Sequence, residues 1–152
     1  MGCAWNWYGK FRGMEFDGAK LALICDGCVL TMLRDDKSDI PFPAMWDFPG
    51  GGREGKETPE ECVLRELKEE FGLRLSLDCL TYRFQRPGIL EKQAQIWFFG
   101  TVLDGFSQMK IEFGDEGQMW EMMPVETYLD HPDAIPHLRD GLRKFLGHLK
   151  GK

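Results

Sequence analysis

The pattern of apolar and polar residues along the chain predicts a set of short strands. Two apolar stretches, 19–26 and 28–34, flank the Asp26-Gly27 dipeptide, which is a favoured two-residue turn of a β-hairpin. The polar, proline-containing stretch 35–44 predicts a loop, and a short aromatic strand at 46–49 runs into three glycines. Further strands are expected at 75–86, 93–103, 110–113 and 119–123, with Pro87-Gly88 as a turn between the first two.

A helix is predicted at 59–71, because capping signals mark both of its ends. Thr58 and Glu61 have the spacing of a capping box, Pro59 suits the first helical position, and Gly72 suits the C-terminal cap. Apolar residues at helical spacing predict two later helices, at 125–129 and 135–149. Strands before and after a central helix, followed by a terminal helix, predict an α+β fold in which a mixed sheet packs between helices.

The predicted central helix has two distinct faces. At about 100° per residue, an apolar stripe is formed by Leu64, Leu67 and Phe71, whereas a different face carries Glu66, Glu69 and Glu70. Like charges three or four residues apart cost about 0.2–0.5 kcal/mol per pair on an isolated helix. Hard divalent cations, which prefer oxygen ligands, relieve such repulsion, so the three glutamates indicate a cation site. The glycines just upstream allow the backbone to approach that site closely.

Composition narrows the class of protein. The chain has 152 residues, of which 43% are hydrophobic and 29% charged, and this is typical of one globular domain, 1–152. A formal net charge of −6 argues against a broad basic surface for duplex nucleic acid or an anionic membrane. No stretch approaches the ~20 apolar residues of a membrane-spanning helix. The N-terminus has no secretory leader pattern, so we expect a cytoplasmic protein.

Cys25 and Cys28 form a C-x-x-C pattern, which occurs in zinc sites and redox pairs. No second C-x-x-C or histidine pair completes a zinc site, and the two cysteines flank the predicted hairpin turn. The turn is therefore the favoured interpretation, with metal or redox chemistry as the alternative.

The glycine-rich segment and the central helix together match a known motif. Gly51 is followed after five residues by Glu57, and after seven more by residues 65–73, which read RELKEEFGL. This 23-residue pattern resembles the Nudix box of the Nudix hydrolase superfamily, and residues 46–51 are especially similar to MutT-like members. The resemblance implies the Nudix fold, an α/β/α sandwich with a mixed central sheet.

The resemblance also implies an activity, the hydrolysis of the pyrophosphate linkage in a nucleoside diphosphate bonded to a group X. The implied cofactor is Mg²⁺, or in some members Mn²⁺. By match to the box, Glu66, Glu69 and Glu70 are implied metal ligands, and the carbonyl of Gly50 or Gly51 is a further one. Metal ions held there would neutralise the phosphates and activate a water molecule for in-line attack.

Other acidic and basic residues have implied supporting roles. Arg65 resembles the residue that orients the glutamates by ion pairing, and Glu57 resembles the supporting acid of the box. The general base varies within the superfamily and often lies outside the box. The candidate here is Glu116, in the polar loop 114–118, with an exposed turn residue as the alternative interpretation.

Aromatic residues are candidates for stacking on a base, because an aromatic face accepts any purine or pyrimidine. The strand candidates for substrate contact are Trp46, Phe48, Tyr82, Phe84 and Trp120, each with core packing as its alternative. Arg86 is a candidate for contact with a phosphate or the ribose, the alternative being an exposed strand-end arginine. The histidines, His137 included, are interpreted as structural or solvated. The aromatic segment 5–8 is a candidate either for covering a sheet edge or for contact in a homodimer.

The leading functional hypothesis is a Mg²⁺-dependent, MutT-like hydrolase of a nucleoside triphosphate or a related small nucleotide. An ADP-ribose or nucleotide-sugar pyrophosphatase is the first alternative, because Pro87 follows the box by 14 residues, as a proline does in that group. Two other substrates are less favoured. MutT-like enzymes that act on oxidised guanine are expected to read the base through an asparagine near the last helix, but Asn6 is the only asparagine in this chain. RNA 5′ ends are less favoured because the acidic chain offers no basic track for RNA phosphates. A Nudix-like sensor without catalysis is a further alternative, but the intact box favours an enzyme.

Overall fold

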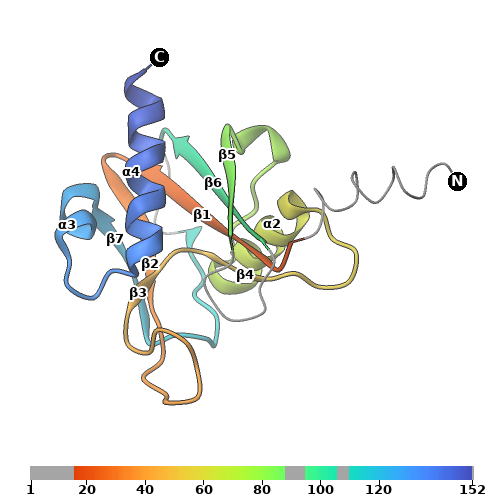
Figure 1. Cartoon of the computed structure of the whole chain (residues 1–152), viewed down its shortest axis with the longest axis vertical. Coiled ribbons are helices and arrows are strands. Elements are labelled where there is room, and N and C mark those ends of the chain that lie inside the picture. Colours follow the sequence, from red (N-terminus) through yellow and green to blue (C-terminus); the bar gives the residue numbers. More distant parts are fainter. Residues whose placement is uncertain (1–15, 88–94, 106–109, 152) are drawn as a thin grey trace, which may run out of the picture.

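The structure is a computed structural model that describes residues 16–87, 95–105 and 110–151 (Figure 1). Its described part has one sheet of seven strands and three α-helices. In chain order the strands before the first described helix, α2, are β1 (Gly18–Cys25), β2 (Cys28–Leu33), β3 (Trp46–Asp47) and β4 (Gly50–Gly52). The remaining elements are α2 (Pro59–Phe71), η1 (Leu77–Cys79), β5 (Tyr82–Pro87), β6 (Gln95–Leu103), β7 (Met119–Pro124), α3 (Val125–Asp130) and α4 (Pro136–Lys150).

Strand β1 lies at the centre of the sheet. It pairs in parallel with β6 over its whole length, and it pairs antiparallel with both β2 and β4. Strand β5 extends the sheet beyond β6, and β2 also pairs with β3 and β7. The predicted hairpin is confirmed: β1 and β2 are joined at Asp26 and Gly27, whose φ angles are 51° and 76°. Positive φ at both positions is the geometry that favours this dipeptide in a tight hairpin.

Helices cover both faces of the sheet (Figure 1). On one face, Leu21 and Leu23 of β1 belong to the same core cluster as Leu67 and Phe71 of α2. On the other, the intervening β1 residues pack with α3 and α4 in a cluster that includes Ala22, Ile24, Tyr128, Leu142 and Phe145. The alternation of β1 side chains between the two clusters follows from the two-residue period of a strand. The predicted α+β fold, a mixed sheet between helices, is confirmed.

Helix α2 begins and ends where its capping signals predict. The Thr58 hydroxyl accepts the Glu61 N–H at 3.1 Å, the Glu61 carboxylate accepts the Thr58 N–H at 2.9 Å, and Gly72 ends the helix at a φ of 67°. The side-chain faces of α2 are therefore those derived from the sequence, with Leu67 in the core.

Two strand predictions are wrong in detail. No strand forms at 110–113, because this segment bonds to the end of α2 instead: Glu112 N–H donates to Phe71 O and Gly114 N–H to Glu70 O, both at 2.9 Å. The strand predicted from residue 75 begins only at Tyr82, after the single 3₁₀ turn of η1. Strand β4 was not expected from the sequence, because it consists of glycines alone and glycine has a low strand propensity.

The aromatic segment 5–8 and the Gly88 half of the predicted turn lie outside the described residues. In the part of the chain that is described, no helix combines the length and apolar character needed to cross a membrane.

Candidate active site

Strand β4 brings the backbone of the glycine segment against the glutamate face of α2. The Gly50 N–H donates to Glu70 Oε1 at 2.9 Å. The Glu66 carboxylate lies so close to Gly51 that a Cβ at Gly51 would collide with Glu66 Oε2. Gly50 has a φ of 140°, and a Cβ there would collide with the Ala19 carbonyl. Both glycines are therefore needed for the close approach of β4 to α2 and β1.

Arg65 pairs with Glu57, Glu66 and Glu69 around this contact. It binds Glu57 through two parallel hydrogen bonds, Nε to Oε2 at 2.5 Å and Nη2 to Oε1 at 3.1 Å. Its Nη1 lies 3.6 Å from Glu66 Oε2 and 3.1 Å from Glu69 Oε1, and Nη2 also donates to the Gly52 carbonyl at 2.9 Å. The hydrogen bonds from Arg65 hold the pKa of Glu57 below its ordinary value. The ion pairing of Arg65 with the glutamates, expected from the resemblance, is present in the structure.

Glu70 is a carboxyl group removed from water. It is 7% exposed, and its burial raises its pKa to about 8, although Lys20 and the Gly50 N–H act in the opposite direction. Burial also raises the pKa of Glu66, with Arg65 opposing and with Glu69 and Glu116 adding to the rise. A buried carboxylate needs a positive partner to stay ionised, so the site favours an additional cation.

Glu116 lies in the loop that follows the 110–114 segment. The segment is anchored to α2 by the Gly114–Glu70 backbone bond, and a Cβ at Gly114 would lie 2.7 Å from the Glu69 carbonyl oxygen. The effect of Glu116 on the pKa of Glu66 places its charge within electrostatic reach of the glutamate face. Glu116 also lines a cavity of about 240 Å³, together with Arg34 and Lys37.

The donors at this contact suit a hard divalent cation, because they are carboxylates and backbone carbonyls. The structure brings Glu66, Glu70 and Gly50 together, while the Glu69 side chain is 56% exposed and turned toward Arg65. The Gly50 carbonyl oxygen lies 3.4 Å from Lys20 Nζ, and Gly51 O accepts the Cys62 thiol at 3.6 Å. Within the described residues, no three His, Cys, Asp or Glu side chains are already gathered as a metal site.

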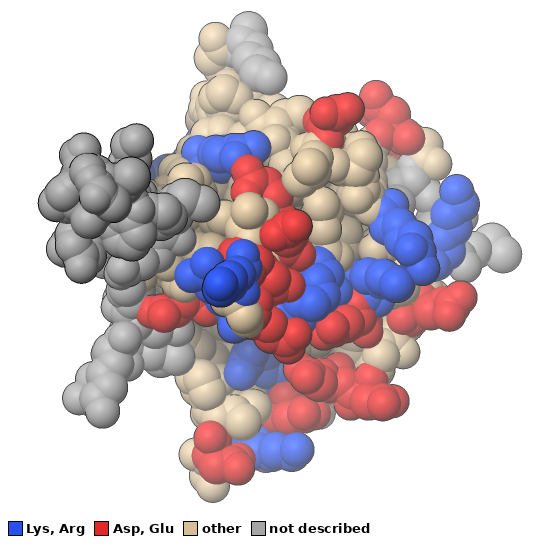
Figure 2. All heavy atoms as spheres, turned by 90° about the vertical axis from the view of Figure 1, so that its right-hand side faces the viewer, with Lys and Arg blue, Asp and Glu red and all other residues tan. Residues whose placement is uncertain are grey.

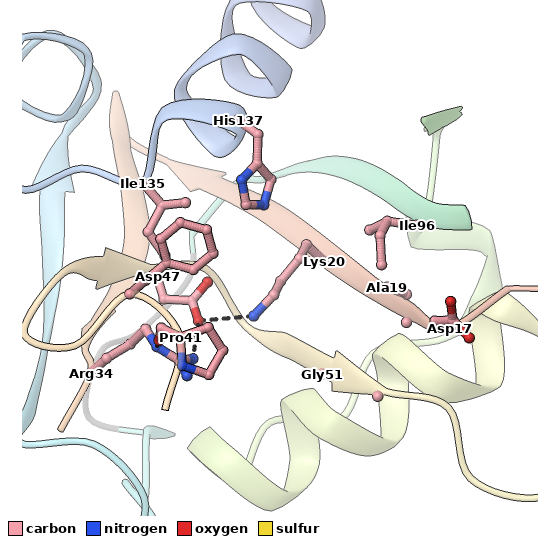
Figure 3. A pocket seen from close by; sticks show the side chains of 13 residues that line it. Asp17, Ala19, Lys20, Arg34, Pro41, Asp47, Gly51, Ile96, Ile135 and His137 are labelled. Atoms are coloured by element: carbon pink, nitrogen blue, oxygen red, sulfur yellow. Dashed lines mark hydrogen bonds and ion pairs between the residues drawn. The ribbon is translucent and has the colours of Figure 1, made fainter. Parts of the chain in front are cut away.

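A cavity of about 220 Å³ opens on the other side of β1 and β4 (Figure 3). Its walls come from β1, β3, β4, β6, Arg34 just after β2, the 41–42 loop and the start of α4. At one end lie Gly51 and Gly52, next to the glutamate face, and at the other lie Phe42, Ile135 and His137. The cavity therefore joins an apolar, aromatic end to the β4 glycines, which contact the acidic cluster of α2.

Three charged side chains meet in the wall of this cavity. Lys20 Nζ and Arg34 Nη1 each donate to Asp47 Oδ2 at 2.9 Å, and Asp47 Oδ1 accepts the Phe48 N–H at 2.8 Å. The Asp47 side chain is 1% exposed, whereas those of Lys20 and Arg34 are 18% and 21% exposed. We call Lys20, Asp47 and Arg34 the ion triad. It carries two positive charges and one negative charge.

His137 forms the far wall of the cavity, where its ring lies 5.5 Å from the ring of Phe42. Burial, with a contribution from Arg86, lowers the pKa of His137 to about 4, so its imidazole is neutral near pH 7. A neutral imidazole offers one hydrogen-bond donor and one acceptor.

Comparison with known proteins agrees with this geometry. The sequence profile described as the NUDIX domain matches residues 19–145, most of the chain. The chain belongs to the Nudix hydrolase superfamily. Residues 51–73 are thus its Nudix box, and the site built by α2 and β4 is the site of that box.

Three Nudix proteins illustrate the similarity. A nucleoside triphosphatase NudI of Salmonella arizonae is 41% identical over 110 residues, which cover 68% of this chain and 77% of that protein. An RNA pyrophosphohydrolase of Hydrogenovibrio crunogenus is 31% identical over 117 residues, covering 63% and 71% of the two chains. The crystal structure of a MutT protein from Methanosarcina mazei superimposes with a TM-score of 0.73 at 20% identity, over 89% of this chain and 95% of that one. This last likeness concerns the fold.

The structure does not support the predicted substrate contacts of Trp46 and Phe48. Phe48 is fully buried between Phe98 and Tyr128, and Trp46 is 8% exposed in the same core cluster, so neither ring offers a face to a base. Both rings point into the core because this face of the sheet is covered by α3 and α4.

The two other predicted contacts also lie outside the 220 Å³ cavity. Arg86 Nη1 donates to the His137 carbonyl at 2.7 Å, so it supports the first turn of α4. Trp120, on β7 opposite Met32, is half-buried against the α2-side core. Tyr82 and Phe84 pack partly buried against the α4-side core.

The residues that do line the cavity centre were missed by sequence reasoning. A weak signal was present: Lys20 and Asp47 are single charged residues inside otherwise apolar strands, where a charge needs a partner or a function. His137 was interpreted as structural or solvated, whereas the structure places it in the cavity wall.

The surface does not form a broad basic area on the face shown in Figure 2, where acidic and basic side chains are interleaved over the described residues. Such a face offers no continuous track for the phosphates of a long nucleic acid.

Proposed function

We propose that the protein is a Mg²⁺-dependent pyrophosphohydrolase of nucleoside triphosphates or closely related small nucleotides. The observation that carries the proposal is that the cavity and the glutamate face meet at the β4 glycines. A cavity with an aromatic end and a cationic centre borders the β4 glycines, and these contact the Glu66 and Glu70 carboxylates. A nucleotide has the same order of parts: a flat base, a sugar and a chain of phosphates.

The metal site is proposed on Glu66, Glu69 and Glu70 with the Gly50 or Gly51 carbonyl. The buried Glu70 carboxyl, whose pKa is raised to about 8, fits this role because a bound cation would hold it in its ionised form. Glu69 would join the set by leaving Arg65. Bound Mg²⁺, or Mn²⁺, would supply charge neutralisation of the phosphates and a water molecule of lowered pKa.

The side chains of the protein then have defined tasks in the reaction. The oxygen of a water molecule attacks one phosphorus, the P–O bond of the anhydride breaks, and the leaving phosphate takes the electron pair. Glu116 is the proposed general base that takes the proton of the water, since its charge lies within reach of the glutamate face and it is exposed. Arg65 holds Glu57 and Glu66 in place.

The base is proposed to lie at the end of the cavity formed by Phe42, Ile135 and His137. An aromatic ring and an aliphatic side chain suit the faces of a base, while a neutral imidazole suits its polar edge. Similarity to a protein named nucleoside triphosphatase supports a triphosphate over other groups X.

The test is a substrate panel with product identification. The purified chain with Mg²⁺ is incubated with the common NTPs and dNTPs, oxidised dGTP, ADP-ribose, a nucleotide sugar, a dinucleoside polyphosphate and a 5′-triphosphate RNA. We expect the highest kcat/KM for a mononucleoside triphosphate, with a nucleoside monophosphate and diphosphate ion as products. Preference for ADP-ribose or for RNA would overturn the substrate assignment. Tight nucleotide binding without turnover would overturn the enzymatic proposal in favour of a sensor.

A further inference from the structure

We propose that Lys20, which lies outside the Nudix box, binds a phosphate oxygen of the substrate directly. Its ammonium group would hold the phosphate chain at the point where the cavity meets the glutamate face. This inference rests on the proposed function, because it assumes that the cavity receives a nucleotide.

The position of Lys20 is the first argument. It is the third residue of β1, and Figure 3 shows its side chain extending into the middle of the cavity, between Asp47 and Gly51. Its Nζ lies 3.4 Å from the Gly50 carbonyl oxygen, and its charge acts on the pKa of both Glu66 and Glu70. Among the described residues, Lys20 is therefore a positively charged side chain that borders both the cavity and the glutamate face.

The hydrogen bonds of Lys20 are the second argument. An ammonium group has three N–H donors. Only the bond to Asp47 Oδ2 is short, at 2.9 Å, while the distances to the Phe48 and Gly50 carbonyl oxygens are 3.5 and 3.4 Å. A phosphate oxygen would be a stronger acceptor than either carbonyl, because charge-assisted hydrogen bonds are shorter and stronger than neutral ones.

The charge of the ion triad is the third argument. Asp47 shares one carboxylate oxygen between Lys20 and Arg34, so the triad holds one positive charge more than its negative charge. Arg65, on the other side of β4, is already bound to Glu57 by two hydrogen bonds. An anion that enters the cavity would balance the triad, and a nucleotide phosphate is an anion of suitable size.

A purely structural role for Lys20, in which it only holds Asp47, makes different predictions. If Lys20 binds phosphate, removing its positive charge weakens phosphate binding. It does not weaken metal binding, because Lys20 repels a cation at Glu66 and Glu70. The fold would remain, since Arg34 still pairs with Asp47 in a Lys20→Met variant. A structural role would instead lower stability, metal binding and binding of the nucleoside part together.

The experiment measures binding by calorimetry in wild type, Lys20→Met, Lys20→Arg and a control, Lys144→Met. Lys144 lies on α4 over the Phe84 ring, so its loss changes the net charge equally without altering the cavity. The probes are the α,β-methylene analogues of ATP and GTP with Mg²⁺, adenosine and guanosine without phosphates, and Mg²⁺ alone. Circular dichroism and thermal melting verify that each variant is folded.

We expect Lys20→Met to bind the methylene analogues about tenfold or more weakly, which is the loss of one charge-assisted hydrogen bond. Nucleoside and Mg²⁺ binding would be unchanged or, for Mg²⁺, tighter, and Lys20→Arg would recover part of the loss. Wild-type affinity of Lys20→Met for the analogues would overturn the proposal, as would an equal loss for analogues, nucleosides and Mg²⁺. Because these are binding measurements, a wild-type protein that binds the analogues but hydrolyses no nucleotide would contradict the proposed function alone.

Discussion

Charge in the cavity is organised around one buried carboxylate. Asp47 lies between two core aromatic residues, Trp46 and Phe48, and its 1% exposure leaves it dependent on Lys20 and Arg34 for compensation. A buried charge that loses its partners is far more costly than an exposed one. At the scale of single residues, the ion triad and the neutral His137 therefore decide how the cavity is charged.

Replacing Asp47 by Asn would leave two cations without their shared anion. We expect Asp47→Asn to lower the free energy of unfolding by about 3 kcal/mol, as for the removal of one member of a buried ion pair. Urea denaturation measures this loss. Asp140→Asn is the matched control, because the Asp140–Arg143 pair is 64% and 55% exposed and should have little effect. Equal stability of the two variants would contradict the structural importance of the triad.

His137 gives the protein a predictable dependence on pH. Its pKa is about 4 in the folded chain and about 6.5 in an unfolded one, so the unfolded chain binds more protons between these values. Stability from the buried neutral ring is complete above pH 6.5 and is lost as the pH falls toward 4. We expect thermal melts between pH 7 and pH 4.5 to show a smaller loss of stability in His137→Gln than in wild type. His148→Gln is the control, because it removes an exposed imidazole. If the melting temperatures of wild type and His137→Gln changed equally with pH, the burial of a neutral ring would be contradicted.

At the scale of elements, α2 was predictable and the cavity was not. The helix boundaries, the capping box and the shared face of Glu66, Glu69 and Glu70 depend on spacing within one short segment, and the structure reproduces the element as predicted. Residues 110–113 have a strand-like pattern, but the tertiary contact with the end of α2 takes their backbone hydrogen bonds. The cavity combines side chains from β1, β3, the 41–42 loop and α4, whose approach depends on long-range pairing that no local pattern contains.

The two glycines of β4 should respond differently to the same substitution. A Cβ at Gly51 would meet only the flexible Glu66 carboxylate, whereas a Cβ at Gly50 would meet the Ala19 backbone at a φ of 140°. We expect Gly51→Ala to fold with little loss of stability but to lose about tenfold or more in kcat, because Glu66 is displaced. Gly50→Ala should lose about 2 kcal/mol or more of stability through backbone strain. Melting temperatures and initial rates of both variants measure this, and an unchanged rate in Gly51→Ala would contradict the placement of Glu66 in the site.

At the scale of the whole molecule, the protein is acidic and its proposed substrate is an anion. A net charge of −6 repels a nucleotide at long range, and the face in Figure 2 adds no basic area that would attract it. Binding must therefore depend on local cations, namely the ion triad inside the cavity and the proposed Mg²⁺ at the glutamate face. The fold brings the two positive groups close together, because β4 lies between the cavity and the glutamate face.

Magnesium should stabilise the folded chain as a whole. It would bind the glutamate face of the native protein and little of the unfolded chain, so stability rises with its concentration. We expect millimolar Mg²⁺ to raise the melting temperature by about 5 °C, which corresponds to about 2 kcal/mol in a domain of this size. A melting temperature that does not change with Mg²⁺ would count against a metal site on α2.

The most direct test of the account is the turnover of Glu70→Gln at saturating Mg²⁺ on the best triphosphate substrate. The substitution keeps an oxygen that can accept the Gly50 N–H and removes the buried charge, so the fold should persist while the metal loses its most enclosed ligand. Glu126→Gln, an exposed residue of α3, is the control. We expect kcat of Glu70→Gln to fall by about 10³-fold or more, with kcat of Glu126→Gln unchanged. A Glu70→Gln protein that turns over at nearly the wild-type rate would contradict this expectation.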